Sequence, residues 1–105
     1  MTEEIRKRLD TICGVIRSTL DTERIYLFGS HAYGTPDKES DIDLCVTIPE
    51  SSLRPLDAVR MIRRAIYDTA RDISLDILVY HSSDFDCRSR TASFERKISR
   101  DGILL

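Results

Sequence analysis

Residues 25–48 read IYLFGSHAYGTPDKESDIDLCVTI, and this stretch decides the fold. Its first four residues form an apolar run that stops at Gly29-Ser30, the pattern of a buried strand that ends in a tight turn. Residues 35–40 are polar and contain a proline, which predicts a loop. From residue 41 to residue 48 polar and apolar side chains alternate strictly, so Asp41 and Asp43 share one face of a second strand.

Helices are expected on both sides of this stretch. Apolar residues at helical spacing predict one helix before it and one after it: Glu3–Leu20, with Thr2 as its cap, and Pro55–Ile73. An apolar run predicts a third strand over 75–80. A last helix containing Phe94 and Ile98 is expected after a cap in residues 82–84, with Gly102 at its end and residues 103–105 packed or paired beyond it. These elements predict a single domain, residues 1–105, of α/β (α+β) class with a small mixed β-sheet packed against helices.

Composition and charge argue against several classes of function. Sixteen Lys and Arg against eighteen Asp and Glu give a net charge of −2, which does not favour a phosphate-driven grip on nucleic acid. No apolar run approaches the ~18 residues of a membrane span, and the chain opens with charged residues in place of a signal peptide, so a cytoplasmic protein is expected. Three cysteines, Cys13, Cys45 and Cys87, match no zinc or disulfide spacing, which predicts reduced thiols.

The acidic residues point to cation chemistry. Asp41 and Asp43 repel each other on a shared face, and Mg²⁺, which prefers oxygen ligands, would relieve that repulsion. Asp76 is the only acid inside the third apolar run, where a carboxylate is costly unless it meets a cation or a proton. A third acid on a neighbouring strand would complete a two-metal site for phosphoryl displacement. A solvated outer face of the strand is the alternative interpretation of Asp41 and Asp43.

Gly29-Ser30 can be interpreted in two ways. A glycine straight after a buried strand lets the backbone approach a ligand, and a small hydroxyl residue at the start of a turn or helix offers N–H and O–H groups to a phosphate. The alternative is an ordinary turn that ends a strand.

Taken together, Gly29-Ser30, ten intervening residues and Asp41-Ile42-Asp43 resemble the nucleotidyltransferase superfamily that includes DNA polymerase β. The run GSHAYGTPDKESDIDL at 29–44 resembles more narrowly the minimal nucleotidyltransferases of bacteria and archaea. The similarity extends to LDILVY at 75–80 and FERKISRDGILL at 94–105. The resemblance implies a polymerase β-like fold in which Gly29 and Ser30 bind the nucleotide phosphates. It also implies that Asp41, Asp43 and Asp76 are catalytic and bind two Mg²⁺ ions, with Mn²⁺ as a substitute.

The implied activity is transfer of a nucleoside monophosphate, AMP from ATP, to a hydroxyl of an acceptor. The resemblance also implies that a HEPN-family protein is the acceptor and partner, and that this chain acts as its antitoxin. A non-catalytic, antitoxin-like binding subunit with a silent or regulatory nucleotide site is the alternative. The nucleotide base and the oligomeric state stay open. His31 and Tyr33 stand where family members often carry arginines; His31 is either a phosphate contact or an exposed loop residue, and Tyr33 either stacks on a base or packs.

Overall fold

The structure is a computed structural model that describes residues 2–34, 36–37, 40–51 and 53–105. Its elements are α1 (Glu3–Thr19), β1 (Arg24–Phe28), α2 (Ser30–Tyr33), β2 (Ile42–Ile48), α3 (Pro55–Ala70), β3 (Leu75–His81), α4 (Ser82–Thr91), α5 (Ser93–Asp101) and β4 (Ile103–Leu104). The predicted α/β class is confirmed. Thr35, Lys38 and Glu39 of the predicted loop lie outside the described residues.

The strands form a mixed sheet, as predicted, in the order β3-β2-β1-β4. β1 runs antiparallel to both β2 and β4, so the last residues of the chain pair with the first strand. β2 and β3 are parallel and are connected through α3, because parallel neighbours need a crossover. In this order β3 lies at one edge of the sheet.

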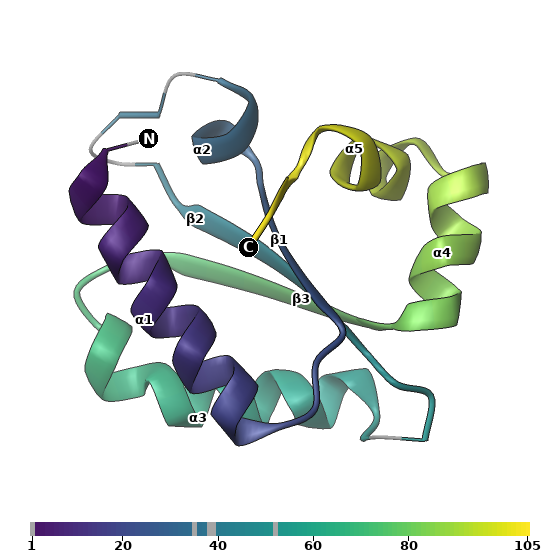
Figure 1. The fold of residues 1–105 in the computed structure, drawn as a ribbon, viewed down its shortest axis with the longest axis horizontal. Helices are drawn as coiled ribbons and strands as arrows, with labels where there is room; N and C mark the ends of the chain where they lie inside the picture. The colour runs from purple at the N-terminus through teal and green to yellow at the C-terminus, as the bar shows by residue number, and fades with distance from the viewer. Residues whose placement is uncertain (1, 35, 38–39, 52) are drawn as a thin grey trace.

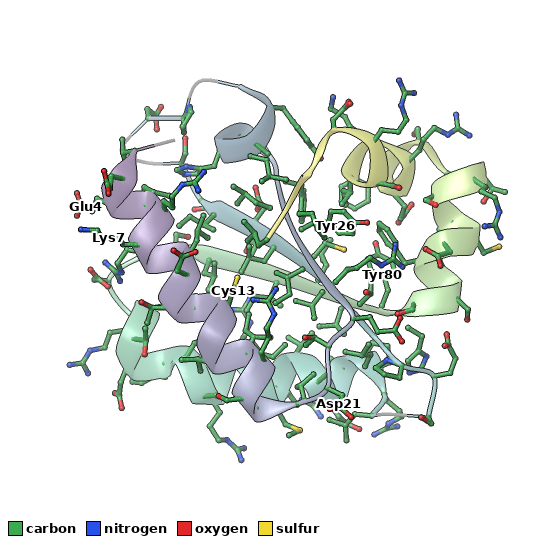
Figure 2. All side chains as sticks on the ribbon, in the orientation of Figure 1. Glu4, Lys7, Cys13, Asp21, Tyr26 and Tyr80 are labelled. Carbon is green, nitrogen blue, oxygen red and sulfur yellow. The ribbon has the colours of Figure 1, made fainter. Side chains whose placement is uncertain are left out.

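Helices cover both faces of the sheet (Figure 1): α1 and α3 lie on one face, and α4 and α5 lie on the other. The main core fills the first face with aliphatic side chains, among them Leu9, Ile12, Ile16, Ile25, Leu27, Leu44, Val46, Ile62 and Ile66. A second, partly aromatic cluster fills the other face with Tyr26, Phe28, Cys45, Phe85 and Ile98. In Figure 2, Cys13 lies beneath α1, whereas Tyr26 and Tyr80 lie toward α4 and α5.

The second cluster buries the other face of β2 as well. Cys45 and Thr47 alternate with the core residues of that strand, and both are fully buried. α4 and α5 cover the face on which Cys45 and Thr47 lie, so this part of the strand is buried on both faces. Only the beginning of the strand, at Asp43, is left partly open.

The helix boundaries follow local chemistry. The Thr2 hydroxyl accepts a hydrogen bond from the Ile5 amide at 3.2 Å, which confirms the predicted cap of α1. α3 begins at Pro55 as predicted but ends at Ala70, three residues before the predicted end. One helix was expected after β3, whereas the structure has α4 and α5, separated by Ala92. α4 has no clear apolar stripe, since Ser82 and Phe85 are its buried residues.

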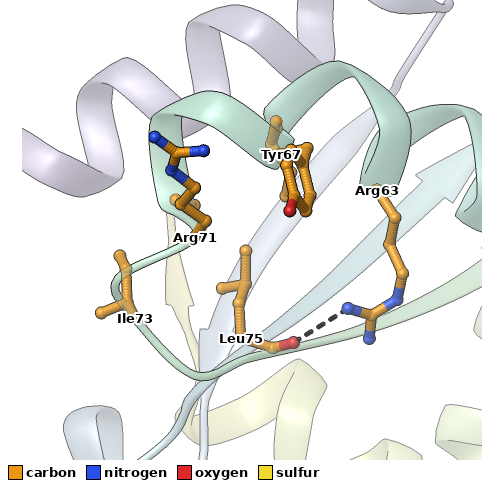
Figure 3. Close-up of a pocket in the computed structure, with 7 residues that line it drawn as sticks. Arg63, Tyr67, Arg71, Ile73 and Leu75 are labelled. Atoms are coloured by element: carbon orange, nitrogen blue, oxygen red, sulfur yellow. Dashed lines mark hydrogen bonds between the residues drawn. The ribbon is translucent and has the colours of Figure 1, made fainter.

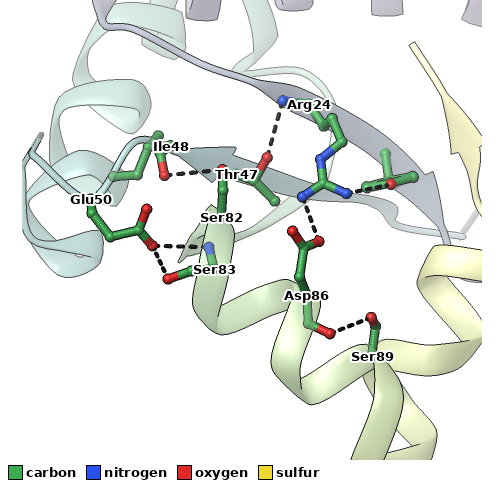
Figure 4. Close-up of polar contacts among 9 residues, drawn as sticks. Arg24, Thr47, Ile48, Glu50, Ser82, Ser83, Asp86 and Ser89 are labelled. Carbon is green, nitrogen blue, oxygen red and sulfur yellow. Dashed lines mark hydrogen bonds and ion pairs between the residues drawn. The ribbon is translucent and has the colours of Figure 1, made fainter.

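Polar contacts fasten α4 to the sheet (Figure 4). The predicted cap residues lie in the first turn of the helix: Ser82 donates to the Ile48 carbonyl at 3.2 Å, and the Ser83 amide donates to the Glu50 carboxylate at 2.9 Å. The Ser83 hydroxyl donates to the same carboxylate, and the hydrogen bonds from the hydroxyl and the amide lower the pKa of Glu50. The cap prediction was wrong because a carboxylate distant in sequence takes that role. The Arg24 guanidinium pairs with Asp86 at 2.7 Å.

α5 is fastened in the same way. Its buried Glu95 accepts a hydrogen bond from the Tyr80 hydroxyl of β3 at 2.8 Å. Gly102 ends the helix as predicted. Cys13 and Cys45 are buried free thiols and Cys87 is an exposed one. None of the helices formed by the described residues has the length and apolarity of a membrane span.

Candidate active site

Two carboxylates meet at the start of the parallel strand pair. Asp43 lies opposite Asp76 in the β2–β3 register, and opposite Phe28 in the β1–β2 register. Residues directly opposite each other on neighbouring strands project from the same face of a sheet. Phe28, Asp43 and Asp76 therefore form a row across the face that α4 and α5 cover. The structure brings together the acid of the second strand and the acid of the third.

The carboxylates of Asp43 and Asp76 repel each other when both are ionised. Partial burial raises the pKa of the Asp43 carboxyl above its ordinary 3.8, and the neighbouring Asp76 raises it further through its charge and a shared hydrogen bond. Asp41 adds to the rise in the pKa of Asp43, whereas His31 opposes it. A cation between Asp43 and Asp76 would remove this repulsion.

Asp41 and Asp76 are placed differently from the sequence expectation. Asp41 lies one residue before β2 and is exposed, and no compact group of three potential ligands is found in the part of the chain that the structure describes. Asp76 is exposed because β3 is an edge strand. The expectation that its charge is costly without a cation or a proton is therefore wrong. Asp43 and Asp76 fit a metal, since Mg²⁺ is usually held by one or two carboxylates plus substrate phosphates. Asp41 as a further ligand stays a prediction.

Gly29 lies against this pair. Its φ of +77° and ψ of −159° belong to a region that only glycine adopts readily, and a Cβ there would overlap with Oδ2 of Asp43. Its carbonyl accepts hydrogen bonds from the amides of Ala32 at 3.0 Å and Tyr33 at 2.9 Å, which starts α2 at Ser30. First-turn amides of a helix have no partner within the helix and can bind an anion. The turn therefore presents N–H groups beside the carboxylates.

His31 and Tyr33 have different surroundings. His31 is half-buried, with Nε2 3.4 Å from the Ser40 carbonyl. The Tyr33 hydroxyl is buried and makes no hydrogen bond of good geometry among the described residues. Burial, followed by the charge of Asp101, raises the pKa of Tyr33, although a weak contact with the Gly29 backbone lowers it slightly. The ring lies under Lys97, whose Nζ is 4.4 Å from the ring centroid. These contacts favour packing for Tyr33. Lys97 was missed because nothing in its sequence spacing links α5 to the turn at Gly29.

Tyr33→Phe is expected to stabilise the protein by about 1 kcal/mol, because an unsatisfied buried hydroxyl costs free energy and phenylalanine keeps the ring. Urea unfolding of both proteins at pH 7 measures the change. Tyr67→Phe is the matched control, since Tyr67 is 63% exposed and should give no change. A loss of stability in Tyr33→Phe would show that its hydroxyl has a partner in solution.

A separate cleft lies on the opposite face of the sheet, between α3 and the start of β3 (Figure 3). It has a volume of about 440 Å³, and its polar groups come mainly from Arg63, Tyr67 and Arg71. Arg63 donates a hydrogen bond to the Leu75 carbonyl at 3.2 Å. Leu75 precedes Asp76 and its side chain packs in the main core, so this cleft does not open onto the carboxylate pair.

Known proteins support an assignment to a family. A family model described as a nucleotidyltransferase domain matches residues 4–102. A putative nucleotidyltransferase from Sulfolobus solfataricus has a similar structure, with a TM-score of 0.64 and 23% identity over 93% of this chain and 76% of that one. A mutant of the toxin–antitoxin MntA-HpeT has a TM-score of 0.61 and 21% identity, over 90% of this chain and 69% of the other.

A toxin–antitoxin structure with AMP-PNP has a TM-score of 0.61 and 23% identity over the same shares of the two chains. At these identities the structures show a shared fold. No curated protein sequence matches the chain. The resemblance to minimal nucleotidyltransferases that the sequence indicated agrees with the family model and with the shared fold. The chain belongs to the nucleotidyltransferase domain family.

Proposed function

We propose that this protein transfers a nucleoside monophosphate, AMP from ATP, to a hydroxyl group of an acceptor. One observation carries the proposal: Asp43 and Asp76 lie in register on neighbouring strands, with the Gly29 turn packed against Asp43. Phosphoryl transfer needs positioning and neutralisation of charge more than covalent chemistry. A turn that begins a helix and can bind phosphate, next to carboxylates that can bind a cation, would supply both. Membership of the nucleotidyltransferase family supports the same activity.

Each residue of the site has a proposed role. The amides and hydroxyl at Gly29-Ser30 bind the terminal phosphates of the nucleotide. Asp43 and Asp76, together with Asp41, would hold Mg²⁺, which would supply neutralisation of the phosphate charge there. Asp76 accepts the proton of the acceptor hydroxyl. A new bond forms between the acceptor oxygen and the α-phosphorus, the bond from that phosphorus to the β-phosphate oxygen breaks, and pyrophosphate leaves.

Label transfer from α-labelled ATP tests the proposal. The chain is incubated with Mg²⁺, labelled ATP and candidate acceptors, and release of pyrophosphate is measured in parallel. Label on an acceptor that disappears in Asp43→Asn but persists in Asp10→Asn, an exposed acid of α1, would support the enzyme. Tight binding of ATP without any transfer to the acceptors would favour the alternative, a binding subunit with a silent site.

Mg²⁺ or Mn²⁺ is expected to raise the melting temperature, and more so with ATP present. A ligand that binds only the folded state at one hundred times its dissociation constant adds about 2.7 kcal/mol. Differential scanning calorimetry measures the shift. The double variant Asp41→Asn/Asp43→Asn should lose it, whereas Asp10→Asn should keep it. An equal shift in the double variant would place the cation elsewhere.

A helical HEPN-family protein is the proposed acceptor and partner. Asp76 lies on the edge strand β3, so the acceptor side of the site is open to another molecule. One of the proteins that share this fold is described as the toxin–antitoxin MntA-HpeT. Co-purification with a HEPN protein, followed by intact mass measurement with and without ATP, tests the proposal. Absence of both a complex and an added AMP mass would favour a small-molecule acceptor.

A further inference from the structure

A cavity of about 350 Å³ lies beside the carboxylate pair, between the Gly29 turn and α5. It is lined by Phe28, Tyr33, Ser93, Phe94, Lys97 and Ile98. Two of these residues flank the turn, since Phe28 directly precedes Gly29 and Tyr33 ends α2. Phe28 also lies opposite Asp43 in the sheet register. The cavity is therefore one strand away from Asp43, on the side opposite Asp76.

The walls of this cavity suit a flat aromatic ligand. Phe94 is 51% exposed although it is a large apolar residue, and its ring meets Phe28 edge to face, with the ring centroids 5.8 Å apart. Lys97 holds its ammonium over the Tyr33 ring and pairs with Asp101 at 3.2 Å. Aromatic faces that stack on bases, with a cation beside them, are a common way to bind a nucleobase. The volume lies in the range of small-molecule sites.

We propose that this cavity binds the base of the nucleoside triphosphate, with Phe94 as the stacking residue. The inference rests on the proposed function and adds a base site to it. In an in-line displacement the acceptor and the leaving pyrophosphate lie on opposite sides of the α-phosphorus. With pyrophosphate at Gly29-Ser30, the acceptor approaches over Asp76. The cavity lies on the far side of Asp43 from Asp76, away from the proposed path of the acceptor. The nucleoside part of the nucleotide can therefore occupy the cavity.

Isothermal titration with ATP and with inorganic tripolyphosphate, both with Mg²⁺, separates base binding from phosphate binding. Wild-type protein is expected to bind ATP more tightly than tripolyphosphate. Phe94→Ala should weaken ATP binding about tenfold and leave tripolyphosphate binding unchanged, since loss of a stacking side chain affects only the base. Phe94→Trp should retain ATP affinity. Tyr67→Ala, which removes an exposed aromatic side chain from the opposite face, is the matched control and should have no effect.

The outcomes distinguish this inference from the proposed function. Equal weakening of ATP and tripolyphosphate in Phe94→Ala would show a structural role and overturn the base site. Unchanged ATP affinity with a raised KM for the acceptor would show that the cavity binds the acceptor, and would overturn the base site as well. Normal label transfer with no effect of Phe94 would reject the base site alone. ATP binding that depends on Phe94 without any transfer would reject the enzyme and keep the base site.

Discussion

Asp43→Asn is expected to reduce nucleotide transfer by about 10³-fold, because a metal ion contributes several kcal/mol of charge stabilisation in such transition states. Asp43 contacts both other parts of the site: it lies opposite Asp76, and Gly29 packs against its Oδ2. Steady-state kinetics with saturating ATP and Mg²⁺ measure the loss. The exposed Asp10→Asn, which makes the same chemical change on α1, should retain full activity. Near-normal transfer by Asp43→Asn would remove this residue from the mechanism.

The same substitution should stabilise the metal-free protein. The pKa of Asp43 is raised in the folded state, so the folded protein binds its proton more tightly than the unfolded chain does. The free energy of unfolding of the metal-free wild type should therefore fall as pH rises from 3.8 through the raised pKa, and stay reduced above it. Asp43→Asn should lack this decline. Thermal unfolding in EDTA from pH 3.5 to 8 measures both curves, and parallel curves would contradict the prediction.

Asp76→Asn offers an independent check of the pair. Removing its charge should lower the pKa of Asp43, since Asp76 is the largest charged contributor to that shift. Because Asp76 is exposed, folding should be unaffected while transfer is lost. A variant that unfolds would give Asp76 a structural role.

Gly29→Ala is expected to lower transfer by about 100-fold or more, which is the scale of a 1 Å displacement of a catalytic group. The new methyl group would overlap with Oδ2 of Asp43, so the carboxylate or the turn must move. Alanine at φ +77° also costs about 1–3 kcal/mol of stability, because this region of backbone space is essentially limited to glycine. Activity and urea unfolding of the same preparation separate the two effects.

The chain offers a matched control for this substitution. Gly14 lies inside α1, and a Cβ there would meet nothing within 4 Å. Gly14→Ala should keep full activity and stabilise the protein by roughly 0.5–1 kcal/mol, because alanine loses less conformational entropy in a helix. Full activity in Gly29→Ala would show that the close approach to Asp43 is not needed for transfer.

The sequence by itself determined the elements with strong local patterns. The apolar run before Gly29, the alternation after Asp41 and the helical spacing of α1 and α3 are local signals. Each of these elements formed at the predicted place, although α3 ends three residues early. The match between the Gly29-Ser30 and Asp41-Ile42-Asp43 spacing and a known family also came from sequence alone. The helix α4, which covers Cys45 and Thr47, was not predicted, because it has few apolar residues of its own.

Only the tertiary structure decided how the site is assembled. Strand register, which depends on contacts between segments more than thirty residues apart, paired Asp43 with Asp76 and left Asp41 before the strand. Strand order put Asp76 at the sheet edge, where water solvates its charge. Packing of α5 against the Gly29 turn brought Phe94 and Lys97 to Phe28 and Tyr33. A local sequence pattern encodes periodicity along the chain, whereas these neighbours are fixed by the burial of surfaces distant in sequence.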